Sequence, residues 1–161
     1  MRKALEFAAL AGLVVLFAIT AWAFFGPNPL SARIAIHFGF DGRPNRWGSS
    51  AMLWFQPAVA AFIYVLMTVV SRFPASFNFP VRVTPRTRPK LEALALQMIV
   101  WLKAELMILL SWVQWATIRS ARDSALSLSP WFVPIFLAAI WVTIGCYVVA
   151  MRKTARAPQS N

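Results

Sequence analysis

Charged residues are scarce in this sequence: they make up 13% of its 161 residues, whereas a soluble domain carries about 25%. Only five residues are acidic, and there is one histidine and one cysteine. A single cysteine excludes a disulfide framework within the chain. One histidine with so few carboxylates also leaves too few ligands for a stable metal site. We therefore expect no disulfide, no metal and no other cofactor.

Apolar residues, in contrast, make up 60% of the chain and gather in four long runs. The hydrocarbon core of a bilayer is about 30 Å thick, and a helix of about 20 apolar residues crosses it. The runs predict four transmembrane helices, at residues 4–25, 51–71, 91–118 and 130–151. We expect an all-α integral membrane protein with one four-helix membrane domain over residues 1–161.

The first apolar run has features of a secretory signal peptide. It follows Met1-Arg2-Lys3, and residues 21–23 read Ala-Trp-Ala. Signal peptides, however, have apolar cores of about 7–15 residues, and this run is longer and ends in Phe24-Phe25. We favour an uncleaved membrane anchor over a signal peptide.

The net charge of +11 comes from basic residues that lie between the apolar runs, not on one soluble face, so we expect no nucleic-acid binding. With a cytoplasmic N-terminus, ten Lys and Arg residues fall in inner segments and five in outer loops. Inner loops are the ones enriched in Lys and Arg. This bias predicts a multi-pass protein of the cytoplasmic membrane with both termini in the cytoplasm.

In this topology residues 72–90 form a basic cytoplasmic loop and residues 152–161 a cytoplasmic tail. The loop's charge is explained by topology and by contact with anionic lipid. A cytoplasmic partner is the alternative.

Residues 26–50 form the outer loop, which is too long for a plain connection between neighbouring helices and is expected to be structured. In Arg33-Ile-Ala-Ile-His-Phe38, apolar residues at 34, 36 and 38 alternate with Ala35 and His37, which predicts a short extended segment. Tight turns follow. Asp41 is expected to bond its own backbone and Gly42 to take a positive φ.

His37 has two interpretations. It pins the turn by bonding Asp41 or a loop carbonyl, or it binds a ligand or senses protons, because a histidine changes charge in mild acid. No catalytic group is assembled around it: Cys146 lies across the membrane in this topology, and Ser49 and Ser50 have no base triad. We expect no enzymatic activity.

The stretch Ile34-Ala-Ile-His-Phe-Gly-Phe-Asp-Gly-Arg-Pro-Asn-Arg-Trp-Gly-Ser49 resembles the signature of a bacterial membrane family, that of domain of unknown function 1648. This family includes the SdpI-type immunity proteins, in which I-P-I-H-F/W is followed by G-x-P-[DN]-x-[YW]-[GA]-[SK]. Ala35, Gly39 and Ser50 depart from that pattern. The residues that fit it are His37, Phe38, Gly42, Pro44, Asn45, Trp47, Gly48 and Ser49.

A second stretch, Phe77-Asn-Phe-Pro-Val-Arg-Val-Thr-Pro-Arg-Thr87, resembles the lead into the third helix of short, stand-alone members, with Arg86 and Thr87 in place of their Glu-Asn. The resemblance implies four or more membrane helices and an exposed loop. For some relatives it implies immunity to a secreted toxin, or autoregulatory sensing. For short members it implies no established activity.

Lys103 and Glu105 fall within the third apolar run, where a charge costs about 2.5–3.5 kcal/mol. Two residues apart on a helix, they point about 200° away from each other and cannot pair. Gln114 shares the azimuth of Lys103, and Gln97 lies about 80° from Glu105. We expect Lys103 to extend toward the cytoplasmic surface.

Glu105 is too short to reach the surface. It is either bonded to a polar group on another helix or part of a proton or substrate path. The candidate hydrogen-bond partners are Thr68, Ser71 and Thr143.

These features favour a non-enzymatic integral membrane protein whose outer loop binds or senses an extracytoplasmic peptide or protein. The resemblance implies that this role is in immunity or signalling. A small proton-coupled transporter that uses Glu105 is one alternative, and an assembly subunit of a membrane complex is another. The lipid bilayer is the expected partner. The sequence does not decide whether another membrane protein or a second copy of the chain is also a partner.

Overall fold

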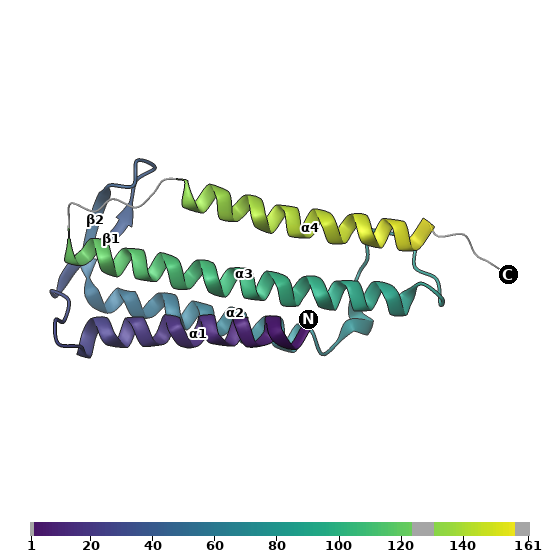
Figure 1. Ribbon diagram of the computed structural model, residues 1–161, viewed down its shortest axis with the longest axis horizontal. Helices are drawn as coiled ribbons and strands as arrows, with labels where there is room; N and C mark the ends of the chain where they lie inside the picture. The colour runs from purple at the N-terminus through teal and green to yellow at the C-terminus, as the bar shows by residue number, and fades with distance from the viewer. Residues whose placement is uncertain (1, 124–130, 157–161) are drawn as a thin grey trace.

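The computed structural model describes residues 2–123 and 131–156 of the chain (Figure 1). Within these ranges it is mostly helical, with one small sheet. The elements in chain order are α1 Arg2–Phe25, β1 Arg33–Phe38, β2 Pro44–Ser49, the 3-10 helix η1 Ser50–Trp54, α2 Phe55–Val70, the 3-10 helix η2 Pro74–Ser76, α3 Arg88–Arg122 and α4 Phe132–Arg156.

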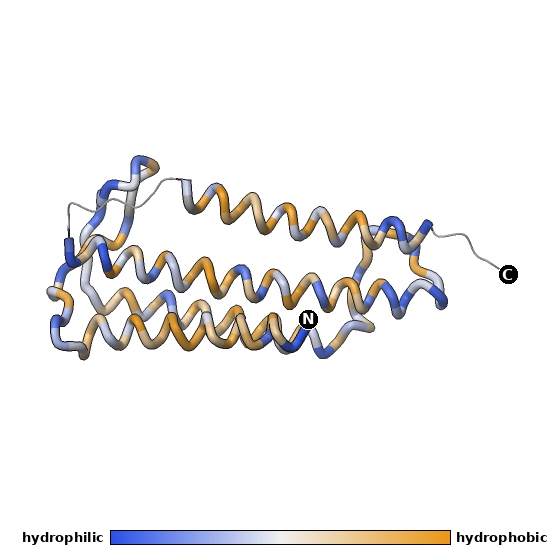
Figure 2. The backbone as a smooth tube through the Cα atoms, viewed as in Figure 1, coloured by the Kyte–Doolittle hydropathy of each residue, from blue (hydrophilic) through white to orange (hydrophobic). Residues whose placement is uncertain are grey.

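Four helices are long and apolar enough to cross a membrane, which confirms the predicted fold class. Hydrophobic residues follow the helices, and hydrophilic ones gather mainly toward the two ends of the bundle (Figure 2). The helix bounds differ from the predicted spans in places. The first turns of the second span are 3-10 helix, and α4 continues into the predicted tail as far as Arg156. The predicted start of the fourth span at residue 130, and residues 157–161, lie outside the described residues.

α3 is the central helix and the longest, with 35 residues against the span of about 20 that a bilayer needs. It runs parallel to α1, so that Lys103 lies level with Glu6 and Ile118 with Ala23. α2 returns antiparallel beside both. The core between these three helices includes the small residues Ala9, Ala60 and Ala104, beside Leu16 and Met107. Small residues let helix backbones approach closely in a membrane, where no hydrophobic effect drives helices together.

α1 and α3 approach each other closely at Gly12. A Cβ atom at this position would lie 3.0 Å from the Cβ of Met107. Ser111 Oγ donates a hydrogen bond to the Gly12 carbonyl oxygen at 2.7 Å. A side chain at position 12 would therefore be crowded by Met107, and α1 and α3 would have to separate by a few tenths of an ångström to admit it.

α4 packs mainly on α3 and leaves most of its surface open (Figure 1). Of its described residues, only Met151 is buried. Gly145 illustrates the open face, since a Cβ there would meet no atom within 4 Å. An apolar face of this kind is suited to lipid contact.

The small sheet lies at one end of the bundle, which we call the hairpin end (Figure 1). β1 and β2 pair antiparallel, with Arg33 opposite Ser49 and Phe38 opposite Pro44. The sequence predicted the extended segment that forms β1, but it missed β2, which covers a stretch interpreted as turns. The pairing arises because Gly42 and its neighbours reverse the chain within a few residues.

The opposite end, which we call the basic end, holds the segment 71–87 and the C-terminal end of α4 (Figure 1). This segment folds onto the helices through Phe77 and Phe79, which pack against Leu91 and Met151.

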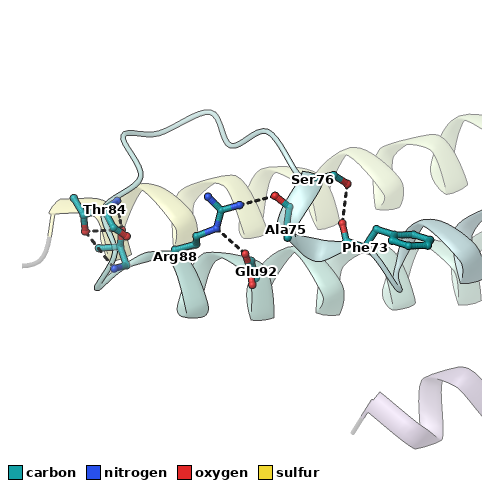
Figure 3. A network of polar contacts seen from close by, with 7 residues as sticks. Phe73, Ala75, Ser76, Thr84, Arg88 and Glu92 are labelled. Carbon is teal, nitrogen blue, oxygen red and sulfur yellow. Dashed lines mark hydrogen bonds and ion pairs between the residues drawn. The ribbon is translucent and has the colours of Figure 1, made fainter.

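The start of α3 is fixed by a small polar network (Figure 3). Thr84 and Thr87 exchange hydrogen bonds, in which each backbone N–H donates to the hydroxyl oxygen of the other residue, at 3.0 and 3.2 Å. Arg88 reaches from α3 to the Ala75 carbonyl oxygen and pairs with Glu92 at 2.9 Å. The basic loop is thus an ordered part of the fold.

Candidate functional site

The hairpin is anchored to three helices through one face of β1. Ile34 is fully buried and packs with Ala23 of α1, Leu53 of η1 and Ile118 of α3. Gly48 on β2 makes room for Ile36, because a Cβ at Gly48 would lie 2.6 Å from the Ile36 Cδ1 atom. This packing places the hairpin on the ends of the helices.

The predicted alternation along β1 is wrong in detail. The pairing register shifts on both sides of His37, and Ala35, which alternates with the apolar residues in the sequence, is 1% exposed. The irregular pairing turns two consecutive residues, Ile34 and Ala35, toward the interior.

The turn between the strands has the predicted chemistry. Gly42 takes a φ of 74°, and the backbone N–H of Arg43 donates to Asp41 Oδ1 at 3.1 Å. The Gly39 N–H donates to the Arg43 carbonyl oxygen at 2.8 Å and closes the turn. Only glycine adopts such a φ without strain, so Gly42 fixes the shape of the tip.

His37 is exposed and bonds across the hairpin. Its Nδ1 atom lies 2.6 Å from Asn45 Oδ1. Because an amide oxygen can only accept, Nδ1–H is the donor, and Nε2 is the ring nitrogen left for another partner. The prediction that Asp41 or a loop carbonyl bonds His37 is wrong, since the partner comes from the opposite strand. The pair joins two of the motif residues.

The outer surface of the hairpin carries aromatic and basic side chains. Phe40 at the tip is fully exposed, and Trp47 is 48% exposed. Arg33, Arg43 and Arg46 are exposed on the same hairpin. The remaining motif residues act on the backbone: Pro44 starts β2, and Ser49 Oγ accepts a hydrogen bond from the Ala51 N–H, which caps η1.

A second polar group lies within the bundle and centres on Lys103, which is 0% exposed. Its Nζ atom lies 2.5 Å from Glu6 Oε2 of α1 and 3.1 Å from Thr68 Oγ1 of α2. The ring of Tyr64, one helical turn before Thr68, is 4.7 Å from Nζ. The ammonium group therefore holds three helices together.

Sequence reasoning missed the pairing of Lys103 with Glu6. From the sequence, Lys103 was expected to extend toward the cytoplasmic surface instead. Glu6 and Lys103 carry opposite charges, and each lies in the first half of its helix. Because both helices begin at the same end of the bundle, this was a usable signal. The signal was incomplete, because only the parallel packing of α1 on α3 brings residues 6 and 103 level.

Glu105 faces the other way, toward α4, as the two-residue spacing predicts. Thr143 Oγ1 donates to Glu105 Oε1 at 2.6 Å, so one of the three predicted partners is the one found. Glu105 Oε2 is buried and has no hydrogen-bond partner within the described residues.

The two glutamines differ in their surroundings. Gln114 is fully buried, on the same side of α3 as Lys103, and donates to Thr20 Oγ1 at 2.8 Å and to the Leu53 carbonyl oxygen at 3.0 Å. Gln97 is half-buried, and no hydrogen bond joins it to Glu105 in the described part of the chain. Another bond that the sequence did not predict links α2 to α3, from Gln56 Nε2 to the Leu110 carbonyl oxygen.

Among residues 2–123 and 131–156, no group of three or more His, Cys, Asp or Glu side chains is close enough to hold an ion. His37 has Asn45 as its close partner, and Cys146 is exposed on α4.

Comparison with known proteins identifies one family. The family model described as domain of unknown function (DUF1648) matches residues 11–68, from α1 through the hairpin to Thr68 of α2. No curated protein and no solved structure matches the chain. The matched region contains all the hairpin residues of the resemblance, and it ends before α3. Residues 11–68, which run from α1 through the hairpin into α2, are similar to the DUF1648 domain.

Proposed function

We propose that this protein spans the cytoplasmic membrane of a bacterial cell with the hairpin outside and both termini in the cytoplasm. Ten Lys and Arg residues belong to the segments toward the basic end and five to the hairpin end. An excess of Lys and Arg on the cytoplasmic side is what orients membrane proteins.

Labelling of intact cells tests this orientation. In a Cys146→Ala background, Arg43→Cys is expected to react with a membrane-impermeant maleimide, and Arg86→Cys only after the cells are opened. Both positions are exposed, so access to reagent is not limited by burial. Labelling of Arg86→Cys but not of Arg43→Cys in intact cells would reverse the orientation.

We further propose that the hairpin is a non-enzymatic binding site for an extracytoplasmic peptide or protein. The observation that carries this proposal is the contrast between its two faces. Ile34 packs the hairpin onto the helices and Gly48 makes room for Ile36 beside it, whereas Phe40, Trp47 and His37 are exposed. Exposed aromatic side chains on an ordered base are typical of recognition surfaces, because little entropy is lost when they bind.

The charges on the hairpin indicate the chemistry of the ligand. Three exposed arginines stand against one carboxylate, that of Asp41, which already accepts the Arg43 N–H. Such a surface favours acidic groups or a free carboxylate, together with an apolar side chain for Phe40 and Trp47. A secreted peptide with these groups fits a role in immunity or signalling, as the resemblance to SdpI-type proteins implies.

A complementation experiment in the native host tests the binding role. Deletion of the gene is expected to change the growth rate of the cells in the cell-free supernatant of the wild-type culture. The intact gene is expected to restore the wild-type growth rate. His37→Ala and Trp47→Ala should fail to restore growth at equal membrane levels of the protein. Glu105→Gln should restore it. Full rescue by both hairpin variants would contradict the proposal.

Transport is the second candidate, and one observation favours it: Glu105 has a buried oxygen without a partner in the described residues. Carboxyl groups within membrane helices commonly mark ion or substrate paths. The same experiment separates the two candidates, since transport requires that Glu105→Gln fail while the hairpin variants succeed. The exposed face of α4 leaves room for a membrane partner, as an assembly subunit would need.

A further inference from the structure

An apolar groove of about 580 Å³ lies at the basic end, between α2 and α4. α2 and the segment after it contribute Val70, Phe73 and Phe79, α3 contributes Ile99, and α4 contributes Ile144 and Val148. Its volume falls within the range of about 300–1,000 Å³ that is common for ligand sites. The groove exists because α4 packs on α3 and leaves α2 unaccompanied on this side.

Three arginines lie within two residues of the groove's lining residues in the sequence. Arg72 precedes the lining residue Phe73, Arg82 lies two residues after the lining residue Pro80, and Arg152 follows the lining residue Met151. All three arginines are exposed, and no acidic side chain pairs with them among the described residues.

The acidic residues nearest to this end are already engaged. Glu92 pairs with Arg88, and Glu6 pairs with Lys103. The three exposed arginines near the groove therefore have no acidic partner among the described residues and are available to an anion outside the chain. Asn78 also lines the groove and has no hydrogen-bond partner within the described residues, so its amide is available to a polar headgroup.

We propose that the groove binds one anionic phospholipid, with an acyl chain between α2 and α4 and the headgroup phosphate beside Arg72 and Arg152. An acyl chain suits a wall of aliphatic and phenyl groups, since it brings no polar atoms that need partners. A peptide strand in this place would leave backbone groups unsatisfied. A second copy of the chain would bring the same excess of cations to the same end.

This site does not depend on the hairpin or its ligand. It would make the lipid a structural part of the protein that fills the space between α2 and α4. The basic loop would then have a defined lipid partner in addition to its effect on topology.

Native mass spectrometry of the full-length protein tests the proposal, with phosphatidylglycerol and phosphatidylcholine of identical chains as probes. One phosphatidylglycerol molecule per chain is expected to stay bound when the detergent is stripped. Val148→Trp, which fills the groove, should abolish this retention. Val149→Trp, on the exposed face one residue further along α4, should leave it unchanged.

The double variant Arg72→Gln with Arg152→Gln tests the contact with the lipid headgroup. Loss of two charges should lower the preference for phosphatidylglycerol over phosphatidylcholine by about 30-fold. The matched control is the double variant Arg33→Gln with Arg46→Gln at the hairpin end. It should leave the preference for phosphatidylglycerol unchanged. Should Val148→Trp fail to fold, Val70→Trp fills the same groove from α2. Equal retention of both lipids, or equal retention by the 148 and 149 variants, would overturn the proposal.

Discussion

Replacing Glu6 by alanine is expected to destabilise the protein more than replacing Lys103 by methionine. Without Glu6, the ammonium group of Lys103 remains 0% exposed, with Thr68 Oγ1 and the Tyr64 ring as its remaining partners. Breaking a buried ion pair typically costs about 3–5 kcal/mol of unfolding free energy, because the charge left behind is not solvated. We expect Glu6→Ala to fall in this range.

Lys103→Met should cost less. The Glu6 side chain is 32% exposed and lies near the start of α1, where the helix dipole favours a negative charge. The double variant should regain most of the stability lost in Glu6→Ala, since it removes both charges. Equilibrium unfolding of the purified full chain in mixed micelles measures all three. If the double variant is as unstable as the sum of the single ones, the pair does not act as a unit.

Gly12→Val is the second exchange expected to have a large effect. Its Cβ would meet Met107 Cβ at 3.0 Å and the Met107 carbonyl carbon at 3.3 Å, so α1 has to move away from α3. The hydrogen bond from Ser111 to the Gly12 carbonyl oxygen would lengthen with it. Overpacking of this kind costs about 1–3 kcal/mol. The same unfolding measurement applies.

Gly145→Val is the matched control, because it makes the same exchange in a membrane helix where nothing lies within 4 Å. Its expected effect is within about 0.5 kcal/mol of zero. Equal losses at both positions would show that the close approach of α1 to α3 is not what requires glycine at position 12.

Both predictions concern the packing of α1 on α3, the helices that support the hairpin. Ile34 rests on α1, η1 and α3 together, so the position of the hairpin depends on how these elements are spaced. The family match ends at Thr68, whereas Lys103, Gln114 and Ile118 come from α3. A helix outside the matched region thus completes the support of the motif inside it.

Local features of the hairpin were accessible from the sequence. The extended segment, the positive φ of Gly42 and the bond to Asp41 follow from neighbouring residues, because turn conformations depend on local sterics and short side-chain bonds. The pairing of β1 with β2 was not accessible, nor was the bond from His37 to Asn45. Both depend on the register, and the register shifts beside His37 have no local signal.

In the membrane helices, too, some features follow from the sequence and others depend on the tertiary structure. Runs of apolar residues determined by themselves that the chain forms four membrane helices, since a bilayer core admits only segments that satisfy their own backbone. The spacing of Lys103 and Glu105 also determined that they face different neighbours. Which neighbours they meet, Glu6 and Thr143, was decided by the tertiary structure alone. Helical periodicity specifies a direction around the axis, whereas the partner also depends on how far two helices are shifted along each other, and only packing sets that shift.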